Sequence, residues 1–476
     1  MESVEKQGFA QRWKAIFGRV AIIPFVFFGV GLYRAWIATL FRYEAFPTIT
    51  VFDYFLFEAA IGVVSLALAF AARRVAPLWA NKPAVIATGA SMTGGSALVV
   101  IACFFVPFEP LKVAGLLLAG GGLGSLILMW AEFYGSLNPL HVALYHAIAI
   151  FVGEVVKWLF LGMSVPYLAF FAVILPPICL ACVRSSMRRL PDRDLPRAVR
   201  EGDVKTIPWK PIFLMATCTF AAAFGALPMQ PLVPGNIVGA LFVTGLVFFG
   251  VLSASRWFNF DTIYQLAFPL FIVGFLFVMP SFAGSAQIMA LCYDAGYTML
   301  SMYIMIVMSN ITYRFGVNAV WINGIERGIR YLVELLGWLT FAGASAYLGS
   351  ADANMVYNGI VVAVVVAFLV IFFTERGLSA KWGVALNDDQ MESGPAEGRT
   401  AMRVSDLSRV YSLSPREEEV LQLLAQRATV AEIEEALYVS QGTVKAHINH
   451  IYRKLGVHSK AELFGLLDSP EKPARR

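Results

Sequence analysis

Basic side chains gather on one predicted helix near the C-terminal end of this 476-residue chain. The helix expected over residues 441–455 contains Lys445, Arg453 and Lys454 and no acidic residue. The two helices expected before it carry glutamates instead: Glu417, Glu418, Glu419, Glu432, Glu434 and Glu435. Because phosphate groups attract Lys and Arg, this separation of charge indicates a helix that contacts a nucleic-acid backbone.

The same region contains the residues that begin and end helices. Ser414-Pro415-Arg416-Glu417 combines an N-cap, a proline at the first helical position and the glutamate of a capping box, and Thr429 with Glu432 repeats the box. Gly456 suits a left-handed C-cap. Four helices are therefore expected, at about 415–426, 430–437, 441–455 and 460–467. The second and third would form a helix-turn-helix.

These residues resemble the LuxR-type helix-turn-helix family over about 55 positions. The opening motif is Leu413-Ser414-Pro415-Arg416-Glu417 followed by Glu419-Val420-Leu421. The recognition helix and its exit match at Ser440, Thr443-Val444-Lys445, His447, Ile451 and Lys454-Leu455-Gly456-Val457. One stretch departs from the family, because Arg427 stands in a turn where Gly is favoured and Glu434 replaces a small residue. We expect the fold to persist there, with altered affinity or backbone contacts.

The resemblance implies a DNA-binding surface on the third helix. Lys445, Ala446 and Asn449 would face the major groove. Thr443, His450, Arg453 and Lys454 would lie near the DNA backbone. In the family the last helix often pairs two such domains on inverted half-sites, which implies a homodimer on DNA.

Other interpretations of these residues remain open at this point. Lys445 and Arg453 could form the solvated face of an ordinary helical bundle. His447 is better explained by packing against the core or backbone than by base contacts. The whole domain could also serve as a protein-interaction module that does not bind DNA.

The rest of the chain is too apolar for a water-soluble protein. Hydrophobic residues make up 58% of the sequence, charged residues only 14%, and the mean hydropathy is +0.68, whereas soluble domains contain about 25% charged residues. Twelve apolar segments, each near the roughly 20 residues that a spanning helix needs, precede residue 376. They lie at about 20–40, 54–72, 84–106, 113–130, 141–163, 165–183, 211–227, 235–254, 262–279, 285–308, 328–348 and 356–373.

Basic residues predict the orientation of these segments. Arg73, Arg74 and Lys82 lie in one predicted inner loop, and a longer loop at about 184–210 holds many more basic residues, whereas the outer loops offer little beyond Arg42 and Lys112. By the positive-inside rule, both termini face the cytoplasm. The amino-terminal segment lacks a convincing cleavage site and is not expected to be a signal peptide. We expect a multi-pass protein of a bacterial cell membrane.

The long inner loop divides the spans six and six. This arrangement over residues 20–375 resembles the major facilitator superfamily. The family's motif between its second and third helices keeps its basic pair here, as Arg73 and Arg74, but lacks its Gly and Asp. The expected fold is all-α: a polytopic helical membrane bundle of about 12 spans (6+6), followed by a four-helix LuxR-type helix-turn-helix domain.

Six ionisable residues are expected within the apolar segments: Arg34, Glu58, Glu154, Lys157, Asp294 and Glu334. Such groups are costly in a bilayer and tend to face a cavity or one another. Arg34 and Glu58 lie at similar depth and could pair, and Glu154 and Lys157 share a helix face. The set could form a ligand site or a proton-sensitive switch, or it could be structural ion pairs that fix helix packing.

The expected domains are a cytoplasmic N-terminal segment (1–19), a membrane sensor domain (20–375), a linker (376–412), a DNA-binding domain (413–467) and a tail (468–476). The sequence shows no catalytic constellation, cofactor motif or metal-ligand spacing, so we do not expect an enzyme. The favoured function is a membrane-embedded one-component transcriptional regulator that senses a ligand or partner. The alternative is a secondary transporter with an appended regulatory helix-turn-helix domain.

Overall fold

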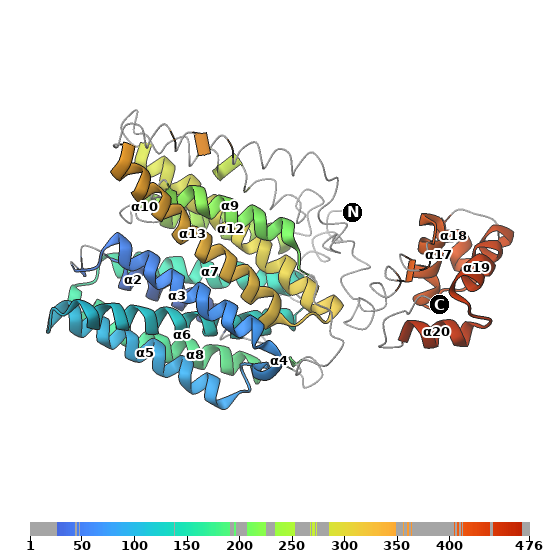
Figure 1. The fold of residues 1–476 in the computed structure, drawn as a ribbon, viewed down its shortest axis with the longest axis horizontal. Helices are drawn as coiled ribbons and strands as arrows, with labels where there is room; N and C mark the ends of the chain where they lie inside the picture. The colour runs from blue at the N-terminus through green and yellow to red at the C-terminus, as the bar shows by residue number, and fades with distance from the viewer. Residues whose placement is uncertain are drawn as a thin grey trace, which may run out of the picture. The chain divides into compact units, whose positions relative to one another are not determined.

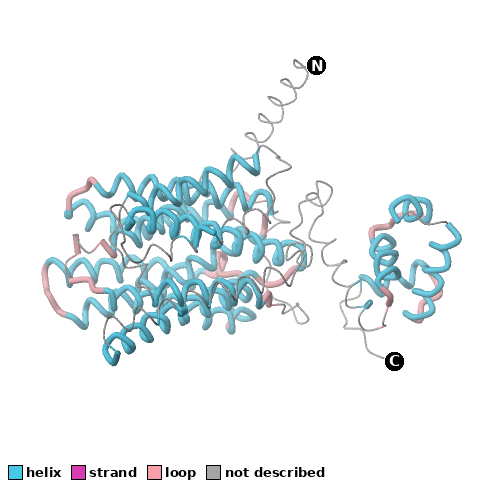
Figure 2. The backbone as a smooth tube through the Cα atoms, turned by 90° about the horizontal axis from the view of Figure 1, so that it is seen from above, coloured by secondary structure: helices cyan, strands magenta, loops and turns pink. Residues whose placement is uncertain are grey.

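A computed structural model describes most of the chain, in two compact units. The described residues are 26–42, 45, 46, 48–137, 139–190, 195, 196, 207–224, 234–252, 267, 269–271, 273, 285–348, 356, 359, 360, 363, 404, 407, 408, 411, 413–437 and 441–468. Among them the regular secondary structure is helical throughout, which confirms the predicted all-α class (Figure 2). Each unit is considered separately below.

Helices lie side by side in the first unit (Figure 1). In chain order they are α2 (Val26–Leu40), α3 (Val51–Phe70), the short α4 (Ala72–Val75), α5 (Lys82–Phe104), α6 (Glu109–Gly135), α7 (Pro139–Leu161), α8 (Val165–Met187), α9 (Trp209–Phe224), α10 (Pro234–Leu252), α12 (Ser285–Phe315) and α13 (Ala319–Leu348).

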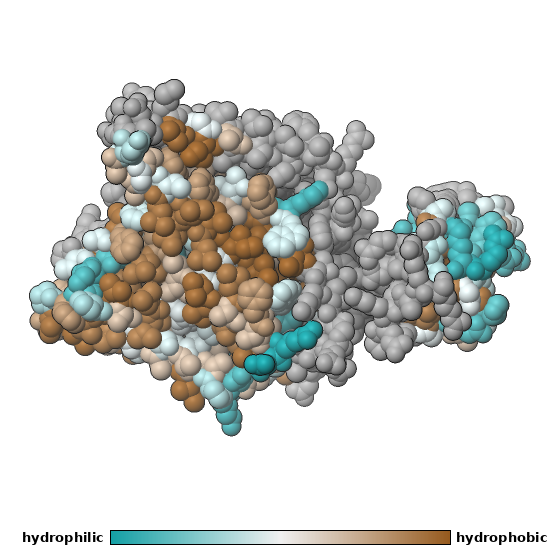
Figure 3. Space-filling view, viewed as in Figure 1, coloured by the Kyte–Doolittle hydropathy of each residue, from teal (hydrophilic) through white to brown (hydrophobic). Residues whose placement is uncertain are grey.

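Ten of the twelve predicted apolar segments coincide with these helices. Most residues of the segments at 262–279 and 356–373 lie outside the described residues. Six described helices are long and apolar enough to cross a membrane: Val51–Phe70, Lys82–Phe104, Glu109–Gly135, His141–Leu161, Val165–Met187 and Gln287–Tyr313. Brown, apolar residues cover much of the face of this unit in Figure 3, as a lipid-facing surface requires.

Glycines allow helices of this unit to approach closely. A Cβ added to Gly122 of α6 would lie 2.9 Å from the backbone nitrogen of Met92 on α5, and one added to Gly324 of α13 would lie 2.6 Å from the carbonyl oxygen of Ser65 on α3. Small residues at such crossings are the usual means of packing helices in a bilayer, where lipid is as apolar as the side chains. The α3–α13 contact therefore joins a helix of the first predicted six-helix half to a helix of the second.

In the part of the second unit that the structure describes, four helices with assigned bounds surround a separate core. They are α17 (Pro415–Ala425), α18 (Val430–Leu437), α19 (Gln441–Leu455) and α20 (Lys460–Asp468). The predicted capping boxes at Ser414 and Thr429 are confirmed by reciprocal hydrogen bonds to Glu417 and Glu432, and Gly456 has a φ of 69°. Ser440, which matches the family motif, lies outside the described residues.

The core of this unit is apolar and draws on all four helices. Its buried members are Val404, Leu407, Val420, Leu421, Leu424, Ile433, Val444, Ile451, Leu455, Val457, Leu463 and Leu467. Val404 and Leu407 come from the segment predicted as linker and are at most 1% exposed. We therefore propose that the folded domain begins before Leu413.

Candidate nucleic-acid interface and buried charged residues

One face of α19 is exposed at the surface of the domain. Val444, Ile451 and Leu455 are buried in the core, which turns the opposite face of the amphipathic helix outward. The exposed residues on α19 are Gln441, Gly442, Thr443, Lys445, Ala446, Asn449, His450, Arg453 and Lys454. All seven positions expected to contact DNA are thus at the surface, as a helix inserted in the major groove requires.

Lys454 and His450 are predicted DNA contacts that also lie against Glu417 of the same domain. Lys454 Nζ lies 2.6 Å from Glu417 Oε2, and His450 Nδ1 lies 3.8 Å from Glu417 Oε1. Glu417 is 4% exposed, and its Oε2 also accepts a hydrogen bond from the Ser414 backbone N–H at 2.7 Å. Lys454 therefore ties the end of α19 to the beginning of α17, a role that the sequence motif did not indicate.

These contacts shift the ionisation of Glu417. Burial alone would raise the pKa of its carboxyl group, but the hydrogen bonds from Lys454 and from Ser414 outweigh burial and lower that pKa from 4.5 to about 2. Glu417 is therefore ionised near neutral pH, and it holds the Lys454 ammonium in place. His447 is half-buried, as its expected packing role requires.

Arg427 occupies the turn between α17 and α18 where the family favours Gly. Its φ is 68°, in the left-handed region that disfavours residues with a Cβ. The guanidinium carbon lies 3.7 Å from the ring centroid of Phe464 on α20, an arrangement in which a cation is attracted to the aromatic face. The predicted persistence of the fold at this departure is confirmed, and the side chain has gained a contact with the last helix.

Within the membrane unit, Glu154 of α7 pairs with two cations. Arg34 Nη2 of α2 lies 3.2 Å from Glu154 Oε1, and Lys157 Nζ lies 2.6 Å from Glu154 Oε2. The expected proximity of Glu154 and Lys157 is confirmed. The suggested pairing of Arg34 with Glu58 is wrong, because the packing of α2 against α7 brings Arg34 to Glu154 instead.

Glu58 faces a different residue of the predicted set. It lies on α3 and interacts with Glu334 of α13 and with the hydroxyl of Tyr54. Glu58 is 6% exposed and Glu334 is 2% exposed. Asp294 of α12 acts electrostatically on Tyr293, as do Glu58 and Glu334. The structure therefore separates an Arg34–Glu154–Lys157 group from Glu58 and Glu334, which interact with each other.

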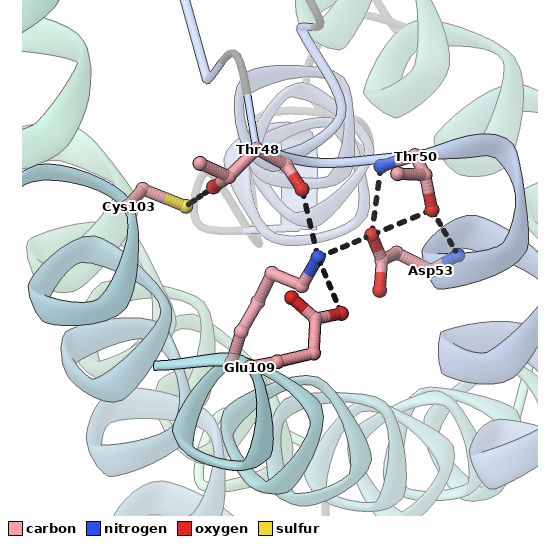
Figure 4. Close-up of polar contacts among 6 residues, drawn as sticks. Thr48, Thr50, Asp53, Cys103 and Glu109 are labelled. Atoms are coloured by element: carbon pink, nitrogen blue, oxygen red, sulfur yellow. Dashed lines mark hydrogen bonds and ion pairs between the residues drawn. The ribbon is translucent and has the colours of Figure 1, made fainter. Parts of the chain in front are cut away.

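Two buried charges that the sequence reasoning did not select have complete sets of partners. Lys112 of α6, expected near an outer loop, is 2% exposed. Its Nζ lies 2.7 Å from the Thr48 carbonyl oxygen, 2.9 Å from Asp53 Oδ2 and 2.9 Å from Glu109 Oε1 (Figure 4). Glu132, also on α6, accepts hydrogen bonds from the backbone N–H groups of Leu78 and Trp79. Lys112 thus binds the segment before α3, and Glu132 binds the segment before α5. We assign both residues structural roles.

Three further buried charges lie on α13 and were also missed. Glu326, Arg327 and Arg330 are between 1% and 6% exposed. Glu326 and Arg327 lie just before the predicted span that begins at 328, whereas Arg330 lies inside that span. All three side chains are buried in the membrane unit.

The membrane unit and the helix-turn-helix unit together define a class: a polytopic helical membrane protein that carries a DNA-binding domain. Residues 411–467 match the family described as bacterial regulatory proteins, luxR family. The chain is 40% identical over 70 residues to a probable HTH-type transcriptional regulator, GfsR, of Streptomyces halstedii, and 53% identical over 51 residues to the oxygen regulatory protein NreC of Staphylococcus aureus. The C-terminal domain is therefore a LuxR-type helix-turn-helix domain.

These likenesses are confined to that domain. They cover 15% and 11% of this chain, and they span 27% and 24% of the two relatives. The membrane unit resembles the crystal structure of the human organic anion transporter MFSD10 (TETRAN), with a TM-score of 0.50 and 12% identity over 72% of this chain and 98% of that one. This likeness shows the fold alone, and it confirms the predicted major facilitator architecture.

Proposed function

We propose that this protein is a membrane-embedded transcriptional regulator that senses a ligand or a membrane partner and binds DNA through α19. The observation that carries the proposal is the exposed face of Lys445, Ala446 and Asn449 in a LuxR-type domain that shares one chain with a major facilitator fold. Lys445 can donate to a guanine edge and Asn449 to an adenine edge in the major groove. Thr443, His450 and Arg453 would meet phosphates beside them.

The orientation of the chain, the dimer on DNA and the coupling between ligand and DNA binding follow from the same arrangement. DNA lies in the cytoplasm, so the helix-turn-helix domain must lie there, in agreement with the positive-inside orientation of both termini. Two domains would pair on inverted half-sites of an operator, as dimers of such domains do. A ligand that favours one conformation of the membrane unit would change pairing or access of the DNA-binding domains. Neither part of the molecule calls for enzymatic activity.

The test is genome-wide crosslinking and sequencing of DNA bound to the full-length protein. We expect discrete sites for the wild type and loss of these sites for Lys445→Ala/Asn449→Ala. A matched control is Gln422→Ala/Gln426→Ala, which truncates two exposed side chains around α17 and should leave occupancy unchanged. Equal occupancy in wild type and the α19 variant would refute direct DNA binding by this face.

A secondary transporter with an appended regulatory domain is the competing function. The fold likeness alone is compatible with it, and the buried Glu154–Lys157 pair is where coupling would be sought. Uptake that depends on Glu154 and continues in the α19 double variant would favour this alternative. We prefer the regulator because the Gly and Asp of the inner-loop motif are missing between α3 and α5.

A further inference from the structure

A small cavity at one end of the membrane unit is bordered by two basic side chains. Its lining combines polar and apolar residues from α2, α7 and α8 and from the chain just after α2, among them Ala38, Thr39, Arg42, Lys157, Phe160 and Leu168. The cavity is partly open, so a chemical group from outside the protein can enter it. Among the described residues of the lining, Lys157 and Arg42 are the charged side chains, and no carboxylate is present. The cavity therefore favours a negatively charged occupant.

The ends of two membrane spans place this cavity at the level of the lipid headgroups. The candidate span His141–Leu161 ends at a residue of the cavity wall, and the span Val165–Met187 begins just after it. Trp158 is 61% exposed and Tyr167 is 65% exposed near the same ends. Large aromatic side chains of this kind gather where the hydrocarbon of a bilayer meets the headgroups. In the proposed orientation, this side of the membrane faces away from the cytoplasm.

Lys157 borders the cavity while its carboxylate partner lies deeper in the bundle. Its Nζ lies 2.6 Å from Glu154 Oε2, and Arg34 Nη2 lies 3.2 Å from the other oxygen of the same carboxylate. The side chain of Glu154 is 0% exposed, whereas that of Lys157 is 12% exposed. One carboxylate thus faces two cations, which leaves this group with a net positive charge. An ammonium group has three N–H donors, so Lys157 can keep Glu154 and still bind an acceptor that enters the cavity.

Arg42 is held in the cavity wall by the end of α7. Its Nη1 donates to the Phe160 carbonyl oxygen at 2.8 Å, and its Nη2 donates to the Leu161 carbonyl oxygen at 3.0 Å. The last carbonyl groups of a helix have no partners within it and carry partial negative charge. Arg42 therefore caps α7, and its guanidinium group is fixed beside the cavity that Lys157 also lines.

The N-terminus of α8 adds a third source of positive potential. The N-cap of α8 is Ser164, and its side chain makes no capping hydrogen bond. Leu168, one turn into the helix, borders the cavity. A helix N-terminus attracts anions, phosphate groups in particular, because its first N–H groups lack partners within the helix. Because Arg42 offsets the negative end of α7, the positive end of α8 is the helix terminus that an occupant would meet.

We propose that the cavity binds the phosphate group of an anionic phospholipid. The Lys157 ammonium would donate to a phosphate oxygen, and Arg42 would supply a fixed positive charge beside it. The acyl chains would lie against the apolar outer surface of α7 and α8. A zwitterionic headgroup fits less well, because the lining that the structure describes offers no carboxylate for its cation. The inference goes beyond the proposed function, since it assigns a lipid to the membrane unit whether or not that unit controls DNA binding.

Lys112 provides a contrast on the same side of the membrane. Its Nζ lies 2.7, 2.9 and 2.9 Å from three oxygen acceptors, two of which belong to carboxylates. A purely structural role therefore explains Lys112. Lys157, by comparison, shares one carboxylate with Arg34 and borders a partly open cavity.

The experiment measures the unfolding temperature of the full-length protein in detergent as phosphatidylglycerol is added. Phosphatidylcholine with the same acyl chains and inorganic phosphate are the comparisons. We expect a saturable rise with phosphatidylglycerol, and a half-saturating concentration at least tenfold higher with phosphatidylcholine. Inorganic phosphate lacks acyl chains and should produce no comparable rise at the same concentration.

Two variants test the cavity in different ways. Ala38→Leu keeps both cations and fills part of the cavity, whereas Lys157→Gln keeps the space and removes a charge. Each should bind phosphatidylglycerol at least tenfold more weakly than the wild type, while eluting as the wild type does in size-exclusion chromatography. The matched controls are Ala87→Leu, at an exposed alanine of α5, and Arg184→Gln, at an exposed arginine of α8. Both should respond as the wild type does.

Three results would overturn the inference: no response of the wild type to phosphatidylglycerol, an equal response to phosphatidylcholine, or an undiminished response in both cavity variants. A rise with inorganic phosphate equal to that with the lipid would show a site for free phosphate in place of the lipid. The DNA occupancy of the Lys445→Ala/Asn449→Ala variant is measured separately, so failure of this inference is distinguishable from failure of the proposed function.

Discussion

Lys454, in the last turn of α19, donates a hydrogen bond to Glu417, in the first turn of α17, with 2.6 Å between Nζ and Oε2. The contact joins residues 37 positions apart in the chain and connects α19, the helix proposed to face DNA, to α17. Glu417 is also the capping-box residue for Ser414. The same carboxylate therefore caps the N-terminus of α17 and binds the side chain of Lys454 on α19.

Removing the Lys454 side chain should therefore lower stability as well as DNA affinity. A hydrogen bond to a charged group contributes about 1.5–3 kcal/mol, and Lys454 is partly exposed, so we expect Lys454→Ala to cost about 1–2 kcal/mol. Urea unfolding of a fragment of residues 400–476, which contains the whole core of the domain, measures the change. Lys445→Ala is the matched control: it should lose DNA binding while stability stays within about 0.5 kcal/mol of wild type.

The depressed pKa of Glu417 predicts an acid-dependent loss of stability. The folded-state pKa of about 2 lies below the ordinary value of 4.5, so the folded domain binds this proton less readily than the unfolded chain does. The stabilisation is fully present above about pH 4.5 and is lost as the pH falls toward 2. Unfolding of residues 400–476 at pH 6, 4, 3 and 2 tests this. In Glu417→Gln the decline over that window should be shallower, and parallel curves would contradict the assignment.

Replacing Arg427 with alanine and with glycine should have different effects on the stability of the domain. Arg427→Ala keeps the unfavourable positive φ and loses the contact with Phe464, so we expect a loss of about 0.5–1 kcal/mol. Arg427→Gly loses the same contact but relieves a backbone conformation that costs roughly 1–2 kcal/mol for a residue with a Cβ. The glycine variant should therefore be at least as stable as wild type and about 1 kcal/mol more stable than the alanine variant. The reverse order in urea unfolding would contradict the assigned backbone strain, because both variants lack the contact with Phe464 and differ only in the backbone.

Glu132 should be required for folding of the membrane unit. Glu132→Leu would leave the N–H groups of Leu78 and Trp79 without their acceptors, at about 1–3 kcal/mol for each buried group. We expect a lower unfolding temperature of the detergent-solubilised protein. Glu132→Gln retains one carbonyl oxygen and should lie between leucine and wild type. An unchanged unfolding temperature for Glu132→Leu would mean that water satisfies both donors.

Gly324 tests the contact between α13 and α3. A Cβ at this position would lie 2.6 Å from the carbonyl oxygen of Ser65, so Gly324→Leu must separate the two helices or prevent folding. We expect reduced crosslinking between cysteines introduced at Leu66 and Gly328, whose added Cβ would contact the Leu66 side chain. Gly343→Leu is the control, since no described atom lies within 4 Å of its added Cβ. Undiminished crosslinking would show that the contact tolerates the larger side chain.

The sequence by itself determined the helices and the class of each domain. Capping boxes at Ser414 and Thr429, the exposed positions of α19 and the apolar segments depend on residues a few positions apart, so their patterns are visible without coordinates. The LuxR-type motif was specific enough to place Lys445, Ala446 and Asn449 on one exposed face. The major facilitator architecture followed from the number and grouping of apolar segments.

Only the tertiary structure decided which buried charges meet. Arg34 pairs with Glu154 rather than Glu58 because its partner depends on how α2 packs against α7. Two residues can lie at a similar depth in the membrane on helices that do not touch, or on helix faces that point away from each other. The same holds for Lys454 with Glu417. These pairings join residues far apart in the chain, so helix crossings that local patterns do not encode bring them together.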